Sequence, residues 1–288
     1  MIRNVQSLKS KVRNYAQMMN VSHQQIIQSY MFERFLERVS YSEFKNNFII
    51  KGGCLLSSVM GLNVRSTMDI DTNIIGIHFQ IDVINNIINS IMKIERDDGV
   101  SFQIKYIQEI KENKEYMGYR FKMIAVFENM KVPFDIDIST GDIITPKAIH
   151  YQYKKLLEDG YIDLMTYNYE TIIAEKLQTV LELKLRNSRM KDYYDLYFFI
   201  SFKWSEVNIT NLIQAIEITF TNRRSMDDLS NALQLLYIFK EDETLNNLWE
   251  KYQMTHSYAM NISFSRIIDA VEKIVLTIYT NNKDIENT

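Results

Sequence analysis

The stretch at residues 48–71 constrains the fold more than any other part of the chain. A short apolar run ends in paired glycines, Gly52 and Gly53, and a second apolar segment follows and stops at the next glycine. Another strand candidate then begins with the acidic residues Asp69 and Asp71. This order predicts a strand, a glycine turn, a helix and a returning strand.

Each half of this stretch favours a particular chemistry. Glycines at the start of a helix let backbone amides approach a phosphate group, and the helix N-terminus attracts an anion. Asp69 and Asp71 are two residues apart, so on a strand both carboxylates point to one face. Two aligned carboxylates suit a hard cation such as Mg²⁺, with triphosphate oxygens completing its shell. Either half alone is more often a plain turn or a solvated face, but the combination favours a nucleotide site.

The motif Gly52-Gly53 followed by Asp69-Ile70-Asp71 resembles the signature of the DNA polymerase β-like nucleotidyltransferases. With its flanking residues it is similar to one branch, the AbiEii/AbiGii toxins of abortive-infection and type IV toxin–antitoxin systems. The flanking residues that carry this likeness are Lys51, Arg65, Ser66, Thr67 and Met68. The resemblance implies that Arg65, Ser66 and Thr67 join the two glycines in binding nucleotide.

The chain departs from the superfamily pattern beside the expected phosphates. Many relatives carry serine where this chain has Gly53, and threonine or another small residue where it has Cys54. A missing hydroxyl at this place would weaken nucleotide binding or remove a site of modification.

A second acidic pair lies on the strand candidate at residues 132–139. Asp135 and Asp137 share one face of that strand, opposite its apolar residues. Superfamily members use a third carboxylate from a neighbouring strand as a metal ligand or general base, and the resemblance assigns this role to Asp137. A base must lie within hydrogen-bond reach of the attacking hydroxyl. Asp142, five residues later, either joins the site or fixes the turn that follows.

The helical pattern at residues 170–186 carries a lysine on its apolar face. Lys176 lies three and four residues from Ile173 and Ile172, so it interrupts the buried stripe. A lysine in this position either extends its amine to the surface or meets an anion. The motif Ala174-Glu175-Lys176-Leu177 is similar to that of the toxin family, which implies contact between Lys176 and nucleotide phosphate.

The segment at residues 189–196 resembles a further motif of the family. In a helix, Asp192 borders the apolar stripe and is the stronger active-site candidate, orienting Lys176 or a base. Asp195 projects further from the stripe and is the second candidate, either for nucleotide binding or for a surface ion pair with Lys191.

The rest of the pattern predicts the remaining elements. Two helices precede residue 48, and Ser22 with Gln25 predicts a capping box at the second. Residues 81–92 predict a helix, and residues 101–110 and 119–127 predict strands. Residues 147–168 are interpreted as a connection, and the chain beyond them as helical.

Composition excludes several classes of protein. Among 288 residues the net charge is −3, so no basic field over the whole chain indicates nucleic-acid binding, although a local basic patch is compatible with it. The single cysteine excludes an internal disulfide framework and favours a cytoplasmic location. Four scattered histidines lack zinc-site spacing, and no signal peptide or membrane-spanning run is expected, hence no membrane partner.

We therefore expect an α/β (α+β) protein with a nucleotidyltransferase-fold mixed sheet. It would comprise an N-terminal helical arm (1–39), a nucleotidyltransferase core (40–165) and a C-terminal helical bundle (166–288). The expected chemistry requires that the three acids, Lys176 and the glycine corner converge on one pocket.

The resemblance implies a growth-inhibiting toxin that transfers a nucleotide from an NTP to an acceptor hydroxyl. Asp69, Asp71 and Asp137 would hold Mg²⁺ or Mn²⁺. The expected acceptor is a tRNA 3′ end or another RNA, and a cognate antitoxin from a neighbouring gene would act without necessarily binding the toxin. Two alternatives stay open: a kinase or nucleotidylating enzyme that acts on protein hydroxyls, and a catalytically silent nucleotide-binding interaction module.

Overall fold

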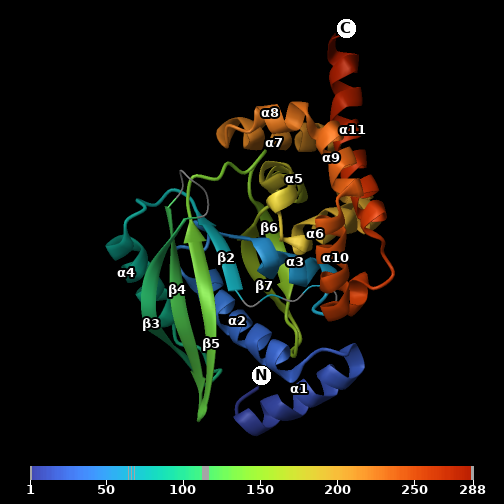
Figure 1. Cartoon of the computed structure of the whole chain (residues 1–288). Coiled ribbons are helices and arrows are strands. Elements are labelled where there is room, and N and C mark those ends of the chain that lie inside the picture. The colour runs from blue at the N-terminus through green and yellow to red at the C-terminus, as the bar shows by residue number, and fades with distance from the viewer. Residues whose placement is uncertain (1, 64, 66, 68, 112–116, 287–288) are drawn as a thin grey trace. The chain divides into compact units, whose positions relative to one another are not determined.

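A computed structural model describes residues 2–63, 65, 67, 69–111 and 117–286 of the chain (Figure 1). These residues form a mixed α/β structure, which confirms the predicted fold class. They divide into two compact units, Met1–Asp142 with Ala148–Tyr167 and Ile143–Lys147 with Asn168–Thr288. The predicted division into arm, core and bundle stays a prediction.

In its described residues, the first unit consists of a mixed sheet and the helices that pack on it. The strands are β1 (Phe48–Lys51), β2 (Asp69–Ile74), β3 (Val100–Lys111), β4 (Met117–Phe127), β5 (Met130–Ser139), β6 (Ile149–Lys154) and β7 (Tyr161–Thr166). The helices are α1 (Val5–Met19), α2 (His23–Tyr41), α3 (Gly52–Met60) and α4 (Ile81–Met92). The strand order is β3-β4-β5-β2-β1-β7-β6; β2 runs parallel to β5 and β1 parallel to β7, while the other neighbours are antiparallel.

Helix α2 covers one face of the sheet (Figure 1). Phe32 and Phe35 of α2 pack against Phe134 of β5, with ring centroids 5.5 and 6.2 Å apart. Because side chains alternate along a strand, Phe134 lies on the opposite face from Asp135 and Asp137. The aromatic packing under α2 therefore leaves the acidic side chains on the other face of the sheet.

Most predicted elements of this unit are confirmed, including the capping box in which the Ser22 side chain accepts a hydrogen bond from the Gln25 amide. The prediction that residues 147–168 form only a connection is wrong, because they contain the β6–β7 hairpin. Strand β6 lies at the edge of the sheet and most of its side chains are exposed. Its aromatic and charged composition therefore lacks the apolar run by which a buried strand is recognised.

The second unit is helical in its described residues, as predicted for the chain beyond residue 168. Its α-helices are α5 (Tyr169–Leu183), α6 (Met190–Phe198), α7 (Ile209–Asn222), α8 (Met226–Ser230), α9 (Ala232–Glu241), α10 (Glu243–Thr255) and α11 (Phe264–Glu286). Asn168 caps α5 by accepting a hydrogen bond from the Thr171 amide at 2.8 Å. Among the described residues, no helix combines the length and apolar character needed to cross a lipid bilayer.

Candidate active site

The glycine corner joins β1 directly to α3. Gly52 has a φ of +61°, in the left-handed region that favours glycine. A Cβ atom on Gly52 would lie only 2.1 Å from Oδ2 of Asp71, so a side chain here would displace that carboxylate. The Gly53 amide donates a hydrogen bond to the same oxygen at 3.0 Å. The N-terminus of α3 therefore positions Asp71, a role for this amide that the sequence did not predict.

Thr67 occupies the space beside Gly53. A Cβ atom on Gly53 would lie 2.6 Å from the Thr67 hydroxyl oxygen, closer than real Cβ contacts allow. That hydroxyl also donates a hydrogen bond to the Asp69 carbonyl at 3.2 Å. A serine at residue 53 would collide with Thr67, so the departure from the superfamily pattern has a steric reason. A hydroxyl still stands at this corner, carried by a different residue.

The other predicted nucleotide ligands near this corner are Arg65 and Ser66. Arg65 is buried, and its guanidinium lies near Gly53. Ser66 lies outside the described residues. Cys54 is also buried, and burial raises the pKa of its thiol. This thiol therefore stays protonated and does not replace a phosphate-binding hydroxyl.

Strands β2 and β5 bring four carboxyl groups to one face of the sheet. Their parallel register pairs Asp69 with Asp135 and Asp71 with Asp137. Burial, followed by the charges of the other three acids, raises the pKa of Asp69 to about 6, while Arg120 opposes the rise. Asp69 therefore lies where negative charge is in excess.

Two basic residues of β4 lie opposite the acids of β5. Arg120 pairs with Asp137 and Lys122 with Asp135 across the antiparallel register. The Arg120 guanidinium donates hydrogen bonds to both Asp137 oxygens, with Nε–Oδ1 and Nη2–Oδ2 distances of 2.6 and 2.5 Å. This bidentate geometry is the strongest form of charge-assisted hydrogen bond between such groups. The carboxylate of Asp137 is therefore already paired with a cationic side chain of the protein, that of Arg120.

Asp142 is tied to the same sheet. Its carboxylate lies 2.8 Å from the Lys51 ammonium, and both side chains are buried. The Tyr167 hydroxyl donates to the same carboxylate at 3.4 Å, and the Asn73 amide donates to the Asp142 carbonyl at 3.1 Å. Of the two predicted roles, these contacts favour the one in which Asp142 fixes the chain after β5, and they anchor it to β1 and β2.

Three basic residues of this cluster were not predicted from the sequence, Lys51, Arg120 and Lys122. A signal for two of them existed: β4 and β5 are joined by a two-residue turn, so Phe127 pairs with Met130. Counting outward from that pair places Arg120 opposite Asp137. A tight hairpin register would therefore have predicted both basic partners.

The acids fit a cation held jointly with a ligand better than one held by protein alone. In the described part of the chain, no three His, Cys, Asp or Glu side chains form a group that could hold a metal ion. Asp69 and Asp71 nevertheless provide the one or two carboxylates with which Mg²⁺ is commonly bound beside substrate phosphates. Burial is the main cause of the raised pKa of Asp69, and a cation would relieve the further rise that the neighbouring acids cause. These two residues therefore suit Mg²⁺ or Mn²⁺.

Lys176 belongs to the second unit, where two acids of α6 surround its ammonium group. The distances are 2.7 Å to Asp192 Oδ1 and 2.6 Å to Asp195 Oδ2. Burial opposes ionisation of Asp192, but Lys176 and Arg189 together hold the pKa of this carboxyl below its usual value. The predicted pairing of Asp192 with Lys176 is confirmed, and the anion that Lys176 meets in this unit is the protein's own.

The prediction that Asp195 projects away from the buried stripe is wrong, because its side chain is fully buried. The prediction assumed that α6 has one buried and one solvated face. Instead, every residue from Asp192 to Phe198 is buried, so the helix is enclosed on all sides. Asp195 therefore does not lie at the surface, where the alternative ion pair with Lys191 was expected.

Two solved structures are similar to the chain. The crystal structure of JHP933 from Helicobacter pylori aligns with a TM-score of 0.49 at 14% identity, covering 93% of this chain and 98% of that one. A candidate nucleotidyltransferase from H. pylori aligns with a TM-score of 0.47 at 15% identity, covering 90% and 98%. No curated protein matches the chain.

The family comparison covers most of the chain. The model described as "Nucleotidyl transferase AbiEii toxin, Type IV TA system" matches residues 34–270. This range includes the glycine corner, the four acids of β2 and β5 and the Lys176 cluster. The chain therefore belongs to the AbiEii family of nucleotidyltransferase toxins of type IV toxin–antitoxin systems.

Proposed function

We propose that the chain transfers a nucleotide from an NTP to the hydroxyl of an RNA acceptor, with a tRNA 3′ end as the best candidate. The observation that carries this proposal is the junction of Gly52, Gly53 and Asp71. There a side-chain-free corner and the N-terminus of α3 meet an acid of a four-carboxyl cluster. A phosphate would bind near this helix N-terminus, beside the acids that would hold its counter-ion.

Each residue of the candidate site in the first unit would have its own role. The corner and the Thr67 hydroxyl would orient the triphosphate, with Arg65 adding positive charge behind them. Asp69 and Asp71 would hold Mg²⁺ or Mn²⁺, with Asp137 as a third ligand or as the group that receives the acceptor proton. The bound cation would neutralise charge on the triphosphate and on the leaving pyrophosphate. Catalysis would then come mainly from position and charge neutralisation.

Lys176 would supply a further cation to the nucleotide phosphates. Its two buried acids, Asp192 and Asp195, fix the position of the ammonium group. Asp192 is thus a positioning residue in this proposal. Direct contact of Asp195 with nucleotide has no support from its geometry, because its carboxylate is buried against Lys176.

A labelling experiment tests the transfer reaction. The purified chain is incubated with each alpha-labelled nucleotide and total RNA in the presence of Mg²⁺. Label on RNA is expected from at least one nucleotide. Label on protein instead, or transfer of a gamma-label only, would replace the proposal by protein nucleotidylation or kinase chemistry.

Variants of the acids give the matching test in cells. Asp69→Ala and Asp71→Ala are expected to abolish both transfer and growth inhibition. Asp71→Asn adds a control, because an amide oxygen can still accept the hydrogen bond from Gly53 while the charge is gone. Asp82→Ala removes an exposed acid at the start of α4 and should leave both activities unchanged. Full toxicity in either alanine variant would contradict the proposal.

The family implies an antitoxin partner. We propose that it is encoded by a neighbouring gene and acts without necessarily binding this chain. Co-expression tests this: growth should be restored by the cognate partner although the two proteins do not copurify.

A further inference from the structure

The first unit contains a cavity of about 220 Å³ on the face of the sheet opposite Asp69 and Asp71. Strand pairing fixes this placement. Ile50 of β1 pairs with Thr166 of β7, and β7 pairs with β6, so Tyr153 in the cavity wall shares the face of Ile50. Lys51, the next residue, pairs with Asp71 on the other face. The cavity is therefore separate from the candidate active site.

A buried acid with an unused oxygen lines this cavity. Glu33 of α2 is 1% exposed, and its Oε1 accepts a hydrogen bond from the Leu156 amide at 2.7 Å. Its Oε2 has no hydrogen-bond partner among the described residues. Its ion pair with Arg34 is long, at 4.0 Å, and Arg34 lies closer to Glu37 and Glu158, at 3.2 and 3.1 Å. A buried carboxyl oxygen without a partner is costly, so a group that pairs with it would be strongly favoured.

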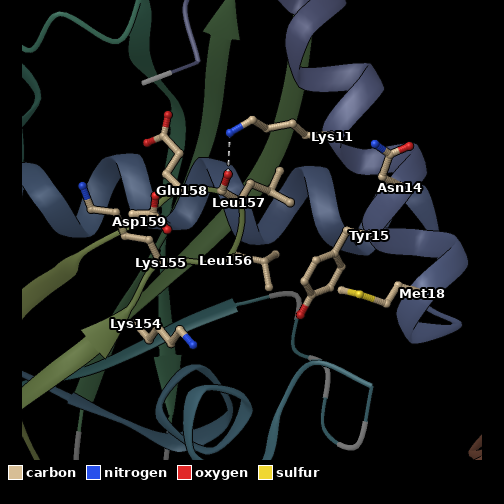
Figure 2. Close-up of a pocket in the computed structure, with 10 residues that line it drawn as sticks. All are labelled: Lys11, Asn14, Tyr15, Met18, Lys154, Lys155, Leu156, Leu157, Glu158 and Asp159. Atoms are coloured by element: carbon tan, nitrogen blue, oxygen red, sulfur yellow. Dashed lines mark hydrogen bonds between the residues drawn. The ribbon is translucent and has the colours of Figure 1, made fainter.

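The rest of the cavity wall is of three chemical kinds. Ser29, Ser57 and Ser58 are hydroxyl residues in it, and Leu62 with Leu156 makes it partly apolar. Lys154 is exposed and also lines a larger outer hollow of about 410 Å³, which shares Tyr15, Lys155 and Leu156 with the inner cavity. Figure 2 shows this outer hollow, where the Lys11 amine donates to the Leu157 carbonyl and Lys154 stands apart from that contact. Glu33 in the inner cavity and Lys154 toward solvent therefore belong to one cavity system.

We propose that this cavity binds a small zwitterion of the α-amino acid class, with its ammonium group on Glu33 and its carboxylate on Lys154. The ammonium group would supply the missing partner of Oε2 and additional donors for the serine hydroxyls. The carboxylate would remain near solvent, where Lys154 is exposed, and a small side chain would contact the leucines. The volume far exceeds the roughly 10–15 Å³ that one water needs, so the cavity can admit a ligand of this size.

The electrostatics of the buried cluster agree with a cationic group. Burial raises the pKa of Glu33 to about 8, with smaller contributions from Glu37 and Glu158, while Arg34 and the Leu156 amide oppose the rise. The carboxyl therefore keeps a proton near neutral pH. A ligand ammonium would replace that proton without adding net charge to the cavity.

Thermal unfolding of the purified full chain tests the site, with each of the common amino acids added at concentrations up to about 10 mM. For the best amino acid, calorimetry then compares the zwitterion with the amine that lacks its carboxylate and with the acid that lacks its ammonium group. We expect the zwitterion to bind at least about tenfold more tightly than either analogue. No stabilisation by any amino acid, or equal binding of the amine alone, would overturn the proposal.

Two variants locate the contacts. Glu33→Gln keeps the shape of the side chain and is expected to lose binding of the zwitterion. Lys154→Met changes an exposed residue, so the fold should persist, and it is expected to bind the amino acid no better than the matching amine. Lys105→Met, at an exposed position on β3, is the control and should bind like the wild type. Unchanged binding in Glu33→Gln would refute the assignment, and none of these measurements depends on transferase activity.

Discussion

Replacing Arg120 by methionine should strengthen the binding of a divalent cation to the nucleotide-free protein. Arg120 holds both oxygens of Asp137, the third acid of the proposed metal site. A cation that uses Asp137 must therefore compete with the guanidinium group. Methionine keeps most of the length and apolar surface of the arginine stem but removes the competing charge.

The size of the effect follows from the geometry of the pair. A hydrogen bond to a charged group contributes about 1.5–3 kcal/mol. The Arg120 side chain keeps 30% of its surface exposed, so screening by water places the value at the lower end. Because about 1.4 kcal/mol corresponds to a factor of ten, the dissociation constant for Mn²⁺ should fall about tenfold.

Electron paramagnetic resonance measures free Mn²⁺ directly during titration with the protein, at fixed ionic strength because the charges are partly exposed. Lys122→Met is the matched control, since it removes an equal charge from the same strand but one that pairs with Asp135, which is outside the proposed metal site and still has Arg120 at 3.9 Å. We expect a much smaller gain in this control. An unchanged or weaker affinity in Arg120→Met would refute competition between Arg120 and the cation for Asp137. An equal gain in both variants would show that the loss of one positive charge from the strand explains the effect.

Three further predictions probe other parts of the chain. Glu33→Gln should remove a pH dependence of the free energy of unfolding. Because the pKa of Glu33 is raised on folding, the folded protein takes up a proton between about pH 4.5 and pH 8. Relative to the variant, the wild type should therefore be most stable below about pH 4.5 and lose up to about 1.4 kcal/mol per pH unit towards pH 8. Denaturant titrations at several pH values would show equal slopes if the carboxyl were already ionised. Lys176→Met removes the cation that two buried acids share, although Arg189 still contacts Asp192, and should lower the free energy of unfolding by about 3–5 kcal/mol. An unchanged midpoint in chemical denaturation would contradict the buried cluster. Gly53→Ser should weaken nucleotide binding in equilibrium titrations, and Thr67→Ala should restore it in the double variant; additive losses would show that the two side chains do not collide.

The parts of the fold that sequence predicted well are those decided by local pattern. The segment at residues 48–71 carries its own turn chemistry, since Gly52 adopts a positive φ between an apolar strand and an apolar helix. The shared face of Asp69 and Asp71 follows from the two-residue period of a strand, whatever the strand's neighbours are. The same period placed Asp135 and Asp137 opposite Phe134, where α2 packs.

The parts that sequence analysis missed depend on which elements become neighbours. Arg120 acquires its role only through the β4–β5 register, which places it across from Asp137. Asp195 looked solvated because a single helix gives no sign that partners will enclose both its faces. Its burial against Lys176 is a tertiary property, and no spacing within residues 189–196 encodes it.

The protein itself supplies counter-charges to most acids of the candidate site. Asp137, Asp135 and Asp142 each contact a basic side chain, and Asp71 accepts a hydrogen bond from a helix N-terminus. Asp69 is different, because it forms no ion pair in the described part of the chain, and its pKa is raised although Arg120 opposes the rise. The negative charge that the protein does not compensate is thus concentrated on one residue beside the glycine corner. A cation arriving with triphosphate would gain most at Asp69, while the protein's own bases keep the neighbouring strands stable before it arrives.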